Sequence, residues 1–193
     1  MLKLEYLFEN YELAREALSL WEHDEDNLEE MLGYFRISSN AVYPFTREGR
    51  ACFLRLAPVG EKAETDVRGE LEFIRYLLKE GYPALRPVRS LSGEDMVVAD
   101  TGFGRYFACV FEKVDGVEIS EAGYGREVMY AYGRALGRLH ALSSGYVPAV
   151  RKQGHKEILE RIRRTLEEYG GCREAFTELA AVERELGRLP VTT

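Results

Sequence analysis

The spacing of the hydrophobic residues changes several times along the chain. Near the N-terminus, apolar residues recur every three or four positions, which predicts an amphipathic helix. Its apolar face comprises Leu4, Leu7, Tyr11, Ala14, Leu18 and Trp21. A polar turn at residues 23–27 ends this helix, and residues 28–32 offer a second, short helical segment.

The next region alternates short apolar runs with turn-forming residues, which indicates β-strands. The predicted strands cover residues 34–37, 41–45, 51–56, 96–99 and 106–114. Small polar residues at 38–40 form the first turn, and residues 46–50 form a hairpin loop. Between the third and fourth strands, residues 63–80 return to helical spacing, and Gly81 and Pro83 end that helix. The pattern therefore predicts an antiparallel sheet of about five strands with one inserted helix.

From residue 116 onward the pattern is helical throughout. The apolar stripes of three predicted helices are Val128, Ala131, Ala135, Leu139 and Leu142, then Ile158, Leu159, Ile162, Leu166 and Tyr169, and finally Phe176, Leu179, Val182 and Leu186. We therefore predict an α+β protein. Residues 1–115 form an N-terminal helix and a β-rich lobe, and residues 116–193 form a helical lobe.

Charge and composition narrow the possible partners. The 193 residues carry a formal net charge of -7, which argues against nucleic acid or an anionic membrane as the main partner. The three cysteines are far apart and odd in number, which favours free thiols over a disulfide framework. The N-terminus lacks a signal-peptide pattern, and no apolar run approaches the ~20 residues needed to span a bilayer. We expect a cytoplasmic protein.

A single cation lies within an apolar strand. Arg55 is embedded in the run Cys52-Phe53-Leu54-Arg55-Leu56, and a buried strand does not carry a charge without a partner. Glu70, on the helix that follows, is the candidate partner. Such a pair positions a cation for the α- and β-phosphates of a nucleotide. From spacing alone, an exposed strand arginine and a solvated helix glutamate fit equally well.

The turn between the first two strands is a candidate phosphate-binding loop. The short side chains of Ser38, Ser39 and Asn40 let backbone N–H groups and hydroxyls approach phosphate oxygens. Ile37 and Val42 flank the turn and offer apolar cover for an adenine ring. The turn has no glycine, however, so an ordinary β-turn flanked by packed strand residues is the alternative interpretation.

A buried strand becomes polar and extended at residues 110–116. A linker of this kind offers backbone C=O and N–H groups that pair with the edge of an adenine. Because backbone groups do this work, the identity of the side chains is only weakly informative, and Phe111 would stand at the back of the pocket.

The order and spacing of several segments along the chain are similar to those of a known protein family. These segments are Ser39-Asn40-Ala41-Val42-Tyr43, Phe53-Leu54-Arg55-Leu56, the helix segment 69–77, the segment 83–88, Asp115-Gly116, and Leu136-Gly137-Arg138-Leu139-His140-Ala141-Leu142. In this order and spacing, the region from Tyr34 to Leu142 resembles the aminoglycoside phosphotransferase family, which includes relatives of choline kinase and homoserine kinase.

The resemblance implies a bilobal, protein-kinase-like fold that uses Mg-ATP to phosphorylate a small hydroxylated or amino-bearing molecule. It makes Arg55 the phosphate-binding cation, Glu70 its helix partner, and Glu112 and Val114 hinge residues. Arginine replaces the usual kinase lysine at position 55. Its planar guanidinium still binds phosphate, with a different reach and geometry.

Phosphoryl transfer also needs a carboxylate that orients the nucleophile and oxygen ligands for magnesium. In the resembled family these come from a His-x-Asp loop and a later aspartate. This chain has no aspartate after Asp115 and no asparagine after Asn40. We therefore expect neither catalytic residues nor metal ligands here, with Mg²⁺ bound only in a complete enzyme. We expect the chain to be part of a longer enzyme and inactive alone.

The first functional hypothesis is the nucleotide-binding portion of a small-molecule phosphotransferase that uses ATP or GTP and an unknown acceptor. The alternatives are a non-catalytic nucleotide-binding or regulatory module and an interaction domain that binds no nucleotide. We also expect self-association through an uncovered apolar stripe at Ile158, Ile162 and Leu166, because large exposed apolar patches rarely stay solvated.

Overall fold

The computed structural model describes residues 10–150 and 154–188. The predicted helical positions Leu4 and Leu7 lie outside these ranges. The chain divides into two compact units after Val150, and each is described separately. The division predicted at residue 115, between a nucleotide-binding lobe and a helical lobe, is a different boundary and stays a prediction.

The first unit is built on an antiparallel sheet of six strands, which confirms the predicted α+β class. The strands are β1 (Arg36–Ile37), β2 (Ala41–Arg47), β3 (Arg50–Pro58), β4 (Pro87–Val88), β5 (Met96–Thr101) and β6 (Gly104–Glu112). Their order is β1-β2-β3-β6-β4, and β5 also pairs with β6. The strand that the sequence pattern does not predict is β4, because two residues are too few to show an alternation.

The hairpin between β2 and β3 is tighter than the predicted five-residue loop. The strands continue to Arg47 and restart at Arg50, so only Glu48 and Gly49 turn the chain, with φ of 53° and 72°. Positive φ at both central residues gives the turn a twist that matches the twist of the flanking strands. The carboxylate of Asp24 accepts hydrogen bonds from both turn N–H groups at 2.9 Å, which fixes this otherwise strained turn.

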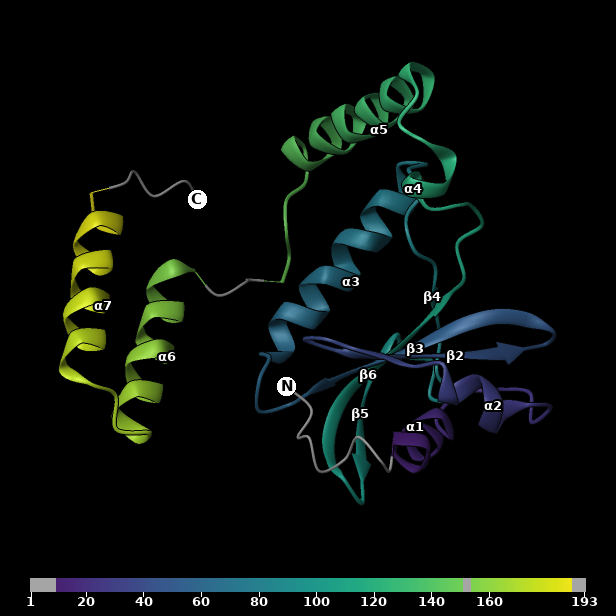
Figure 1. Ribbon diagram of the computed structural model, residues 1–193, viewed down its shortest axis with the longest axis horizontal. Coiled ribbons are helices and arrows are strands. Elements are labelled where there is room, and N and C mark those ends of the chain that lie inside the picture. The colour runs from purple at the N-terminus through teal and green to yellow at the C-terminus, as the bar shows by residue number, and fades with distance from the viewer. Residues whose placement is uncertain (1–9, 151–153, 189–193) are drawn as a thin grey trace. The chain divides into compact units, whose positions relative to one another are not determined.

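Helices cover the two faces of the sheet unequally. On one face, α1 (Asn10–Leu18), α2 (Leu28–Gly33) and Trp21 bury alternate residues of β2, β3 and β6 in the larger hydrophobic core. On the other face, α3 (Glu64–Lys79) packs its apolar stripe on Ala57, Met96, Phe107, Cys109 and Phe111. Figure 1 shows α1 and α2 on one side of the sheet and α3 on the other.

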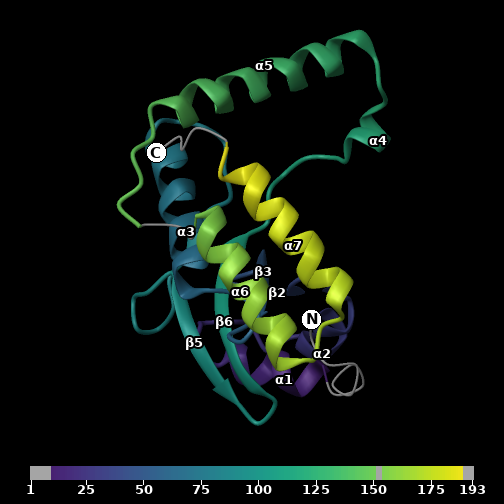
Figure 2. The same ribbon diagram turned by 90° about the vertical axis from the view of Figure 1, so that its left-hand side faces the viewer.

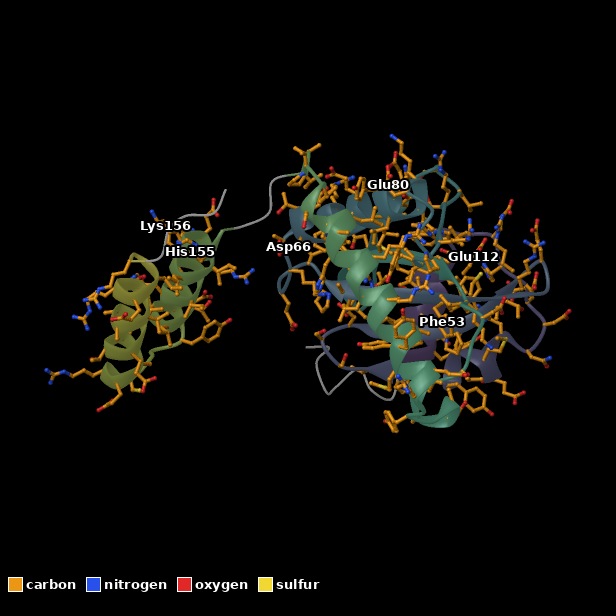
Figure 3. The ribbon with its side chains drawn as sticks, turned by 90° about the horizontal axis from the view of Figure 1, so that it is seen from above. Phe53, Asp66, Glu80, Glu112, His155 and Lys156 are labelled. Atoms are coloured by element: carbon orange, nitrogen blue, oxygen red, sulfur yellow. The ribbon has the colours of Figure 1, made fainter. Side chains whose placement is uncertain are left out.

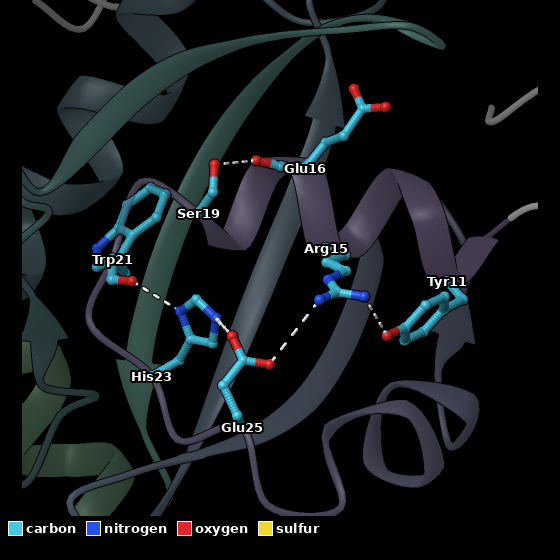
Figure 4. Close-up of polar contacts among 7 residues, drawn as sticks. All are labelled: Tyr11, Arg15, Glu16, Ser19, Trp21, His23 and Glu25. Carbon is cyan, nitrogen blue, oxygen red and sulfur yellow. Dashed lines mark hydrogen bonds and ion pairs between the residues drawn. The ribbon is translucent and has the colours of Figure 1, made fainter.

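The segment that leads from α1 to α2 is held by polar contacts (Figure 4). The Trp21 side chain is buried, and its Nε1–H donates to the carbonyl of Val88 at 3.0 Å. His23 Nδ1 lies 2.9 Å from the Trp21 carbonyl, and its Nε2 lies 3.4 Å from a Glu25 carboxylate oxygen. The sequence pattern places Trp21 on the helix face, but α1 ends at Leu18 and Trp21 follows it.

After β6 the chain forms α4 (Ile119–Ala122) and α5 (Arg126–Ser144), of which only α5 was predicted. Three side chains tie α3 and the loop after it to α5. The hydroxyl of Tyr76 donates to Leu142 O at 3.0 Å, and that of Tyr82 donates to Ala135 O at 3.4 Å. Arg138 Nη2 donates to the carbonyls of Glu80 and Gly81 at 3.1 and 3.0 Å. These contacts hold the end of α3 in place.

The second unit is a helical hairpin of α6 (His155–Glu168) and α7 (Arg173–Leu186), which lie side by side in Figure 2. Both helices were predicted. Arg163 Nη2 donates to both carboxylate oxygens of Glu183, at 2.7 and 2.6 Å. Ile158 and Ile162 remain 38% and 42% exposed. Self-association through them stays a prediction.

Among the residues that the structure describes, no helix has the length and apolar character needed to cross a membrane.

Candidate functional site

One part of the sheet is left open by the helices. Successive residues of a strand point to opposite faces, and β2 and β3 show this clearly. Ala41, Tyr43 and Phe45 are buried beneath α1 and α2, whereas Val42 and Pro44 between them are only half-buried. In β3, the half-buried Phe53 lies on this same side, because it pairs directly with Pro44.

We call this region the open face and define it by Val42, Pro44, Phe53 and Arg55, with the buried Phe111 of β6 at its border. The register joins them across three strands: Val42 is opposite Arg55, Pro44 is opposite Phe53, and Phe53 is opposite Phe111. Figure 3 labels Phe53 on β3 and Glu112 at the end of β6. The open face therefore combines an apolar platform with a cation along one border.

Arg55 and Glu70 form the ion pair that the sequence suggested. Arg55 Nη1 donates to Glu70 Oε1 at 2.6 Å, and Nη2 donates to Oε2 at 3.0 Å. This two-point geometry orients the guanidinium plane. The Arg55 side chain is 16% exposed and the Glu70 side chain 40% exposed, so the pair keeps contact with solvent. The guanidinium also lies 5.1 Å from the centre of the Phe111 ring, a cation–π distance.

The charge of Arg55 affects its surroundings. Burial alone would lower the pKa of its guanidinium, but the hydrogen bonds and negative charge of Glu70 outweigh burial and raise that pKa. Cys109 lies directly opposite Arg55 on β6. Burial raises the pKa of the Cys109 thiol to about 11, although Arg55 acts in the opposite direction. The thiol is therefore neutral at pH 7, and Arg55 keeps its full positive charge.

The linker after β6 passes from a buried strand to exposed residues. Phe111 is buried, Glu112 is exposed, and Val114 is 60% exposed. The N–H of Glu112 donates to Arg86 O, and that of Lys113 donates to Ala51 O, both at 2.9 Å. Within the described residues, the N–H and C=O of Val114 take part in no backbone hydrogen bond. They are therefore available to a ligand.

The turn that joins β1 and β2 is closed by its own backbone. The N–H of Ser38 donates to Asn40 O at 2.9 Å, so this donor is not available to a phosphate. The side chains of Ser38 and Ser39 are exposed. The Asn40 Oδ1 atom is enclosed and accepts no hydrogen bond from the described residues. The turn therefore keeps two serine hydroxyls and the N–H of Ser39 for a ligand, but it lacks the glycines of a glycine-rich loop.

Ile37 does not lie on the open face. It pairs with Ala41 and packs against the core beneath α1 and α2. The expectation that it covers an adenine ring is therefore wrong for this face, and the alternative of strand packing is correct. The three-residue turn explains the difference, because it brings Arg36, and not Ile37, opposite Val42.

Two residues of the open face, Pro44 and Phe53, were not among the predicted site residues. The alternation of side chains along a strand, with a period of two, could have identified them. Phe53 lies two residues before Arg55, and Pro44 lies two residues after Val42, so each shares a face with a residue that was predicted.

A cavity of about 460 Å³ lies between the end of α3 and the linker. Its lining comes from the end of α3, from residues 81–86 and from residues 112–115 of the linker. Arg55, Phe53 and Val42 do not line it, so this cavity is distinct from the open face.

Glu72 lies two residues after Glu70 and holds a different part of the chain. Its two carboxylate oxygens accept hydrogen bonds from the N–H groups of Ala149 and Val150, at 2.7 and 2.8 Å. These bonds favour the charged carboxylate and lower the pKa of Glu72. The α3 helix therefore bonds to Arg55 through one carboxylate and to the end of the first unit through another.

We expect the contact between Glu72 and residues 149–150 to be pH-dependent. Since the folded-state pKa is lowered, the contact is complete at neutral pH and is lost as the pH falls below the ordinary glutamate value of about 4.3. The amide resonances of Ala149 and Val150 should titrate together in this acidic range. In Glu72→Gln, which has no titrating group, this joint transition should be absent. A transition that persists in the variant would contradict the assignment.

The strand order, the ion pair between β3 and α3, and the linker after β6 together define an α+β fold of the kinase-like type. A model of the Phosphotransferase enzyme family matches residues 36–191. The chain belongs to this family, which confirms the resemblance seen in its sequence.

Individual relatives agree with this family. Over 189 residues, the chain is 24% identical to amicoumacin kinase of Bacillus subtilis (strain 168), an alignment that covers 95% of this chain and 54% of the relative. The fold is similar to that of amicoumacin kinase hAmiN, solved in complex with AMP-PNP, Ca²⁺ and Ami. The TM-score is 0.69 at 22% identity, with 98% of this chain and 57% of that chain covered.

A microcompartment-associated aminopropanol kinase has a TM-score of 0.58 at 19% identity, with 74% of this chain and 44% of that chain covered. The chain thus spans about half the length of the relatives that it matches.

Proposed function

We propose that this chain is the nucleotide-binding portion of a small-molecule phosphotransferase and that it binds ATP on the open face. The observation that carries this proposal is the two-point ion pair between Arg55 and Glu70, at the border of a half-exposed apolar platform. A cation held by a helix carboxylate is the arrangement with which kinases position nucleotide phosphates.

The geometry supports a particular orientation of the nucleotide. Phe53 and Phe111 lie beside the linker, whereas Arg55 lies two residues further along β3, about 7 Å away. We infer that the base rests on Pro44 and Phe53, with Val42 at its phosphate-side edge. The opposite edge of the base points toward the free backbone groups of Val114 and the exposed Glu112. The phosphates then extend toward Arg55 and the hydroxyls of the 38–40 turn.

We infer that a phosphotransferase of this family also binds a second substrate, the phosphate acceptor. Relatives are named for amicoumacin and for aminopropanol, which supports a small hydroxylated or amino-bearing acceptor. Residues 116–193 contain no aspartate or asparagine, and within the described residues no three His, Cys, Asp or Glu side chains gather as a metal site. We therefore assign no catalytic residue or metal ligand here, and we propose that this chain alone binds nucleotide without transferring phosphate.

The second candidate function is a non-catalytic, kinase-like nucleotide-binding module. The observation that favours it is the same lack of aspartate after Asp115. Both functions require a nucleotide, so binding tests the shared part. Turnover by the whole polypeptide in which these residues occur distinguishes the two functions.

We expect ATP to stabilise the purified chain against thermal unfolding. A ligand that binds only the folded state adds about 2.7 kcal/mol at 100 times its dissociation constant. Differential scanning calorimetry at increasing ATP concentrations measures this effect, with inorganic phosphate at equal ionic strength as the control. A melting temperature unchanged by millimolar ATP and GTP would contradict the proposal.

A further inference from the structure

A second arginine lies on the same side of the sheet as Arg55. In the β1–β2 hairpin Arg36 is directly opposite Val42, and in the β2–β3 hairpin Val42 is directly opposite Arg55. Directly paired residues of antiparallel strands project from the same face. Arg36, Val42 and Arg55 therefore form one row across three strands. The Cα atoms of the two arginines are two strand spacings apart, roughly 10 Å.

The two arginines differ in their partners. Arg55 is mostly buried and bonded to Glu70, whereas Arg36 is exposed. Among the residues that the structure describes, Arg36 makes no hydrogen bond or ion pair. A charged residue on an edge strand often serves only to prevent unwanted strand pairing. Here, however, Arg36 projects from the same face as Arg55, two strands away, and lies two residues before the 38–40 turn.

The 38–40 turn gives a second reason to expect a phosphate-binding side chain nearby. The Ser38 N–H is already bonded to Asn40 O, and the turn has no glycine. Its backbone therefore offers fewer donors to a phosphate than a glycine-rich loop does. A guanidinium next to it provides several donors in one plane and a full charge, which suits phosphate oxygens.

We propose that Arg36 is a second phosphate-binding residue of the nucleotide site, so that the phosphate chain lies between Arg36 and Arg55. This inference rests on the proposed function. It assigns Arg36 a role in specificity: the residue favours nucleotides with several phosphates over nucleosides and monophosphates. The apolar platform carries the affinity for the base, and Arg36 adds affinity only when a phosphate chain reaches it.

The test is calorimetric titration of the wild-type chain and Arg36→Gln with adenosine, AMP, ADP and ATP. We expect Arg36→Gln to weaken ATP binding by about tenfold, as for the loss of a hydrogen-bonded charge contact. Adenosine binding should change less than about twofold, because the base contacts are intact. Arg36→Lys should recover part of the loss, since it keeps the charge without the planar fork.

Arg50→Gln is the matched control for the change in net charge. Arg50 is also an exposed strand arginine, but it lies on β3 at the opposite end from the phosphate position and on the other face from Arg55. Its substitution should leave ATP binding unchanged. Equal melting temperatures of the variants without ligand would show that each remains folded, as expected for exposed side chains.

Three results would overturn the role of Arg36. Unchanged ATP binding in Arg36→Gln would show that the guanidinium does not contact the ligand. An equal loss for adenosine and ATP would show that it acts on the base. An equal loss in Arg50→Gln would show only a general charge effect. If the wild-type chain binds no ATP, or if Arg55→Ala binds ATP normally, the proposed nucleotide site fails and the role of Arg36 fails with it.

Discussion

Arg55→Ala is expected to weaken ATP binding by about tenfold to a hundredfold while the chain stays folded. The guanidinium is fixed by two hydrogen bonds to Glu70 and by the ring of Phe111. A fixed cation binds phosphate without first losing its conformational freedom, so its removal costs more than that of a mobile surface charge. Adenosine binding should change little, because its contacts lie on the platform.

Isothermal titration with ATP and adenosine measures this effect. Arg55→Lys keeps the charge but not the two-point geometry, so it should retain part of the ATP affinity. Glu70→Gln should also weaken ATP binding, because it leaves the arginine charged but less firmly oriented. Arg47→Ala is the matched control, since Arg47 is another strand arginine paired with a glutamate, Glu22, at 3.1 Å. A variant at position 55 that binds ATP as well as the Arg47 variant would exclude Arg55 from the site.

The stability of Arg55→Ala also distinguishes a binding role of Arg55 from a structural one. Because Glu70 is 40% exposed, water stabilises its charge when Arg55 is removed. The loss of folding stability should therefore be about 1 kcal/mol, well below the cost of breaking a fully buried pair. If Arg55→Ala instead unfolds the chain, the ion pair serves mainly the fold, and the proposed phosphate contact loses its principal support.

Much of this fold can be predicted from local pattern. The strands β2, β3, β5 and β6 and the helices α2, α3, α5, α6 and α7 were predicted within a few residues of their bounds. The Arg55–Glu70 pair could also be predicted from the sequence, because a charge in an apolar strand requires a partner. The helix that follows the strand is the nearest segment that could provide a carboxylate partner.

The orientation of β1 was harder to predict, because it depends on strand register. A shift of one residue in pairing moves every side chain to the other face. The turn contains only three residues, so Ile37 pairs with Ala41 and shares its buried face. Apolar character suggested Ile37 as a ligand contact, but counting across the turn places Arg36, and not Ile37, on the same face as Arg55. Hydrophobicity alone therefore does not show which residue of β1 shares the face of Arg55.

The N-terminal region shows a second limit of local pattern. Helical spacing extends to Trp21, but α1 ends at Leu18 and the indole reaches Val88, 67 positions further along the chain. The spacing of hydrophobic residues cannot report a contact between such distant segments. This contact joins the segment between α1 and α2 to β4, the short strand that was not predicted.

Trp21→Ala is expected to destabilise the first unit by about 3–5 kcal/mol, the range for removing a large aromatic side chain from a core. Trp21 is 1% exposed, and its Nε1–H satisfies the carbonyl of Val88 at 3.0 Å. The alanine variant loses the packing of the indole and leaves a buried carbonyl without this donor. Trp21→Phe keeps most of the apolar volume and removes the donor, so its cost should be closer to about 1–2 kcal/mol, near the value of one lost hydrogen bond.

Urea unfolding followed by far-ultraviolet circular dichroism measures these losses, because Trp21 is the only tryptophan and its fluorescence disappears in both variants. Tyr34→Ala provides the matched control: Tyr34 is 70% exposed, so its loss should change stability by less than about 0.5 kcal/mol. The indole lies beneath the face opposite Arg55. ATP affinity of the folded Trp21→Phe variant should therefore match the wild type, and a large loss of affinity would show that the two faces of the sheet are coupled.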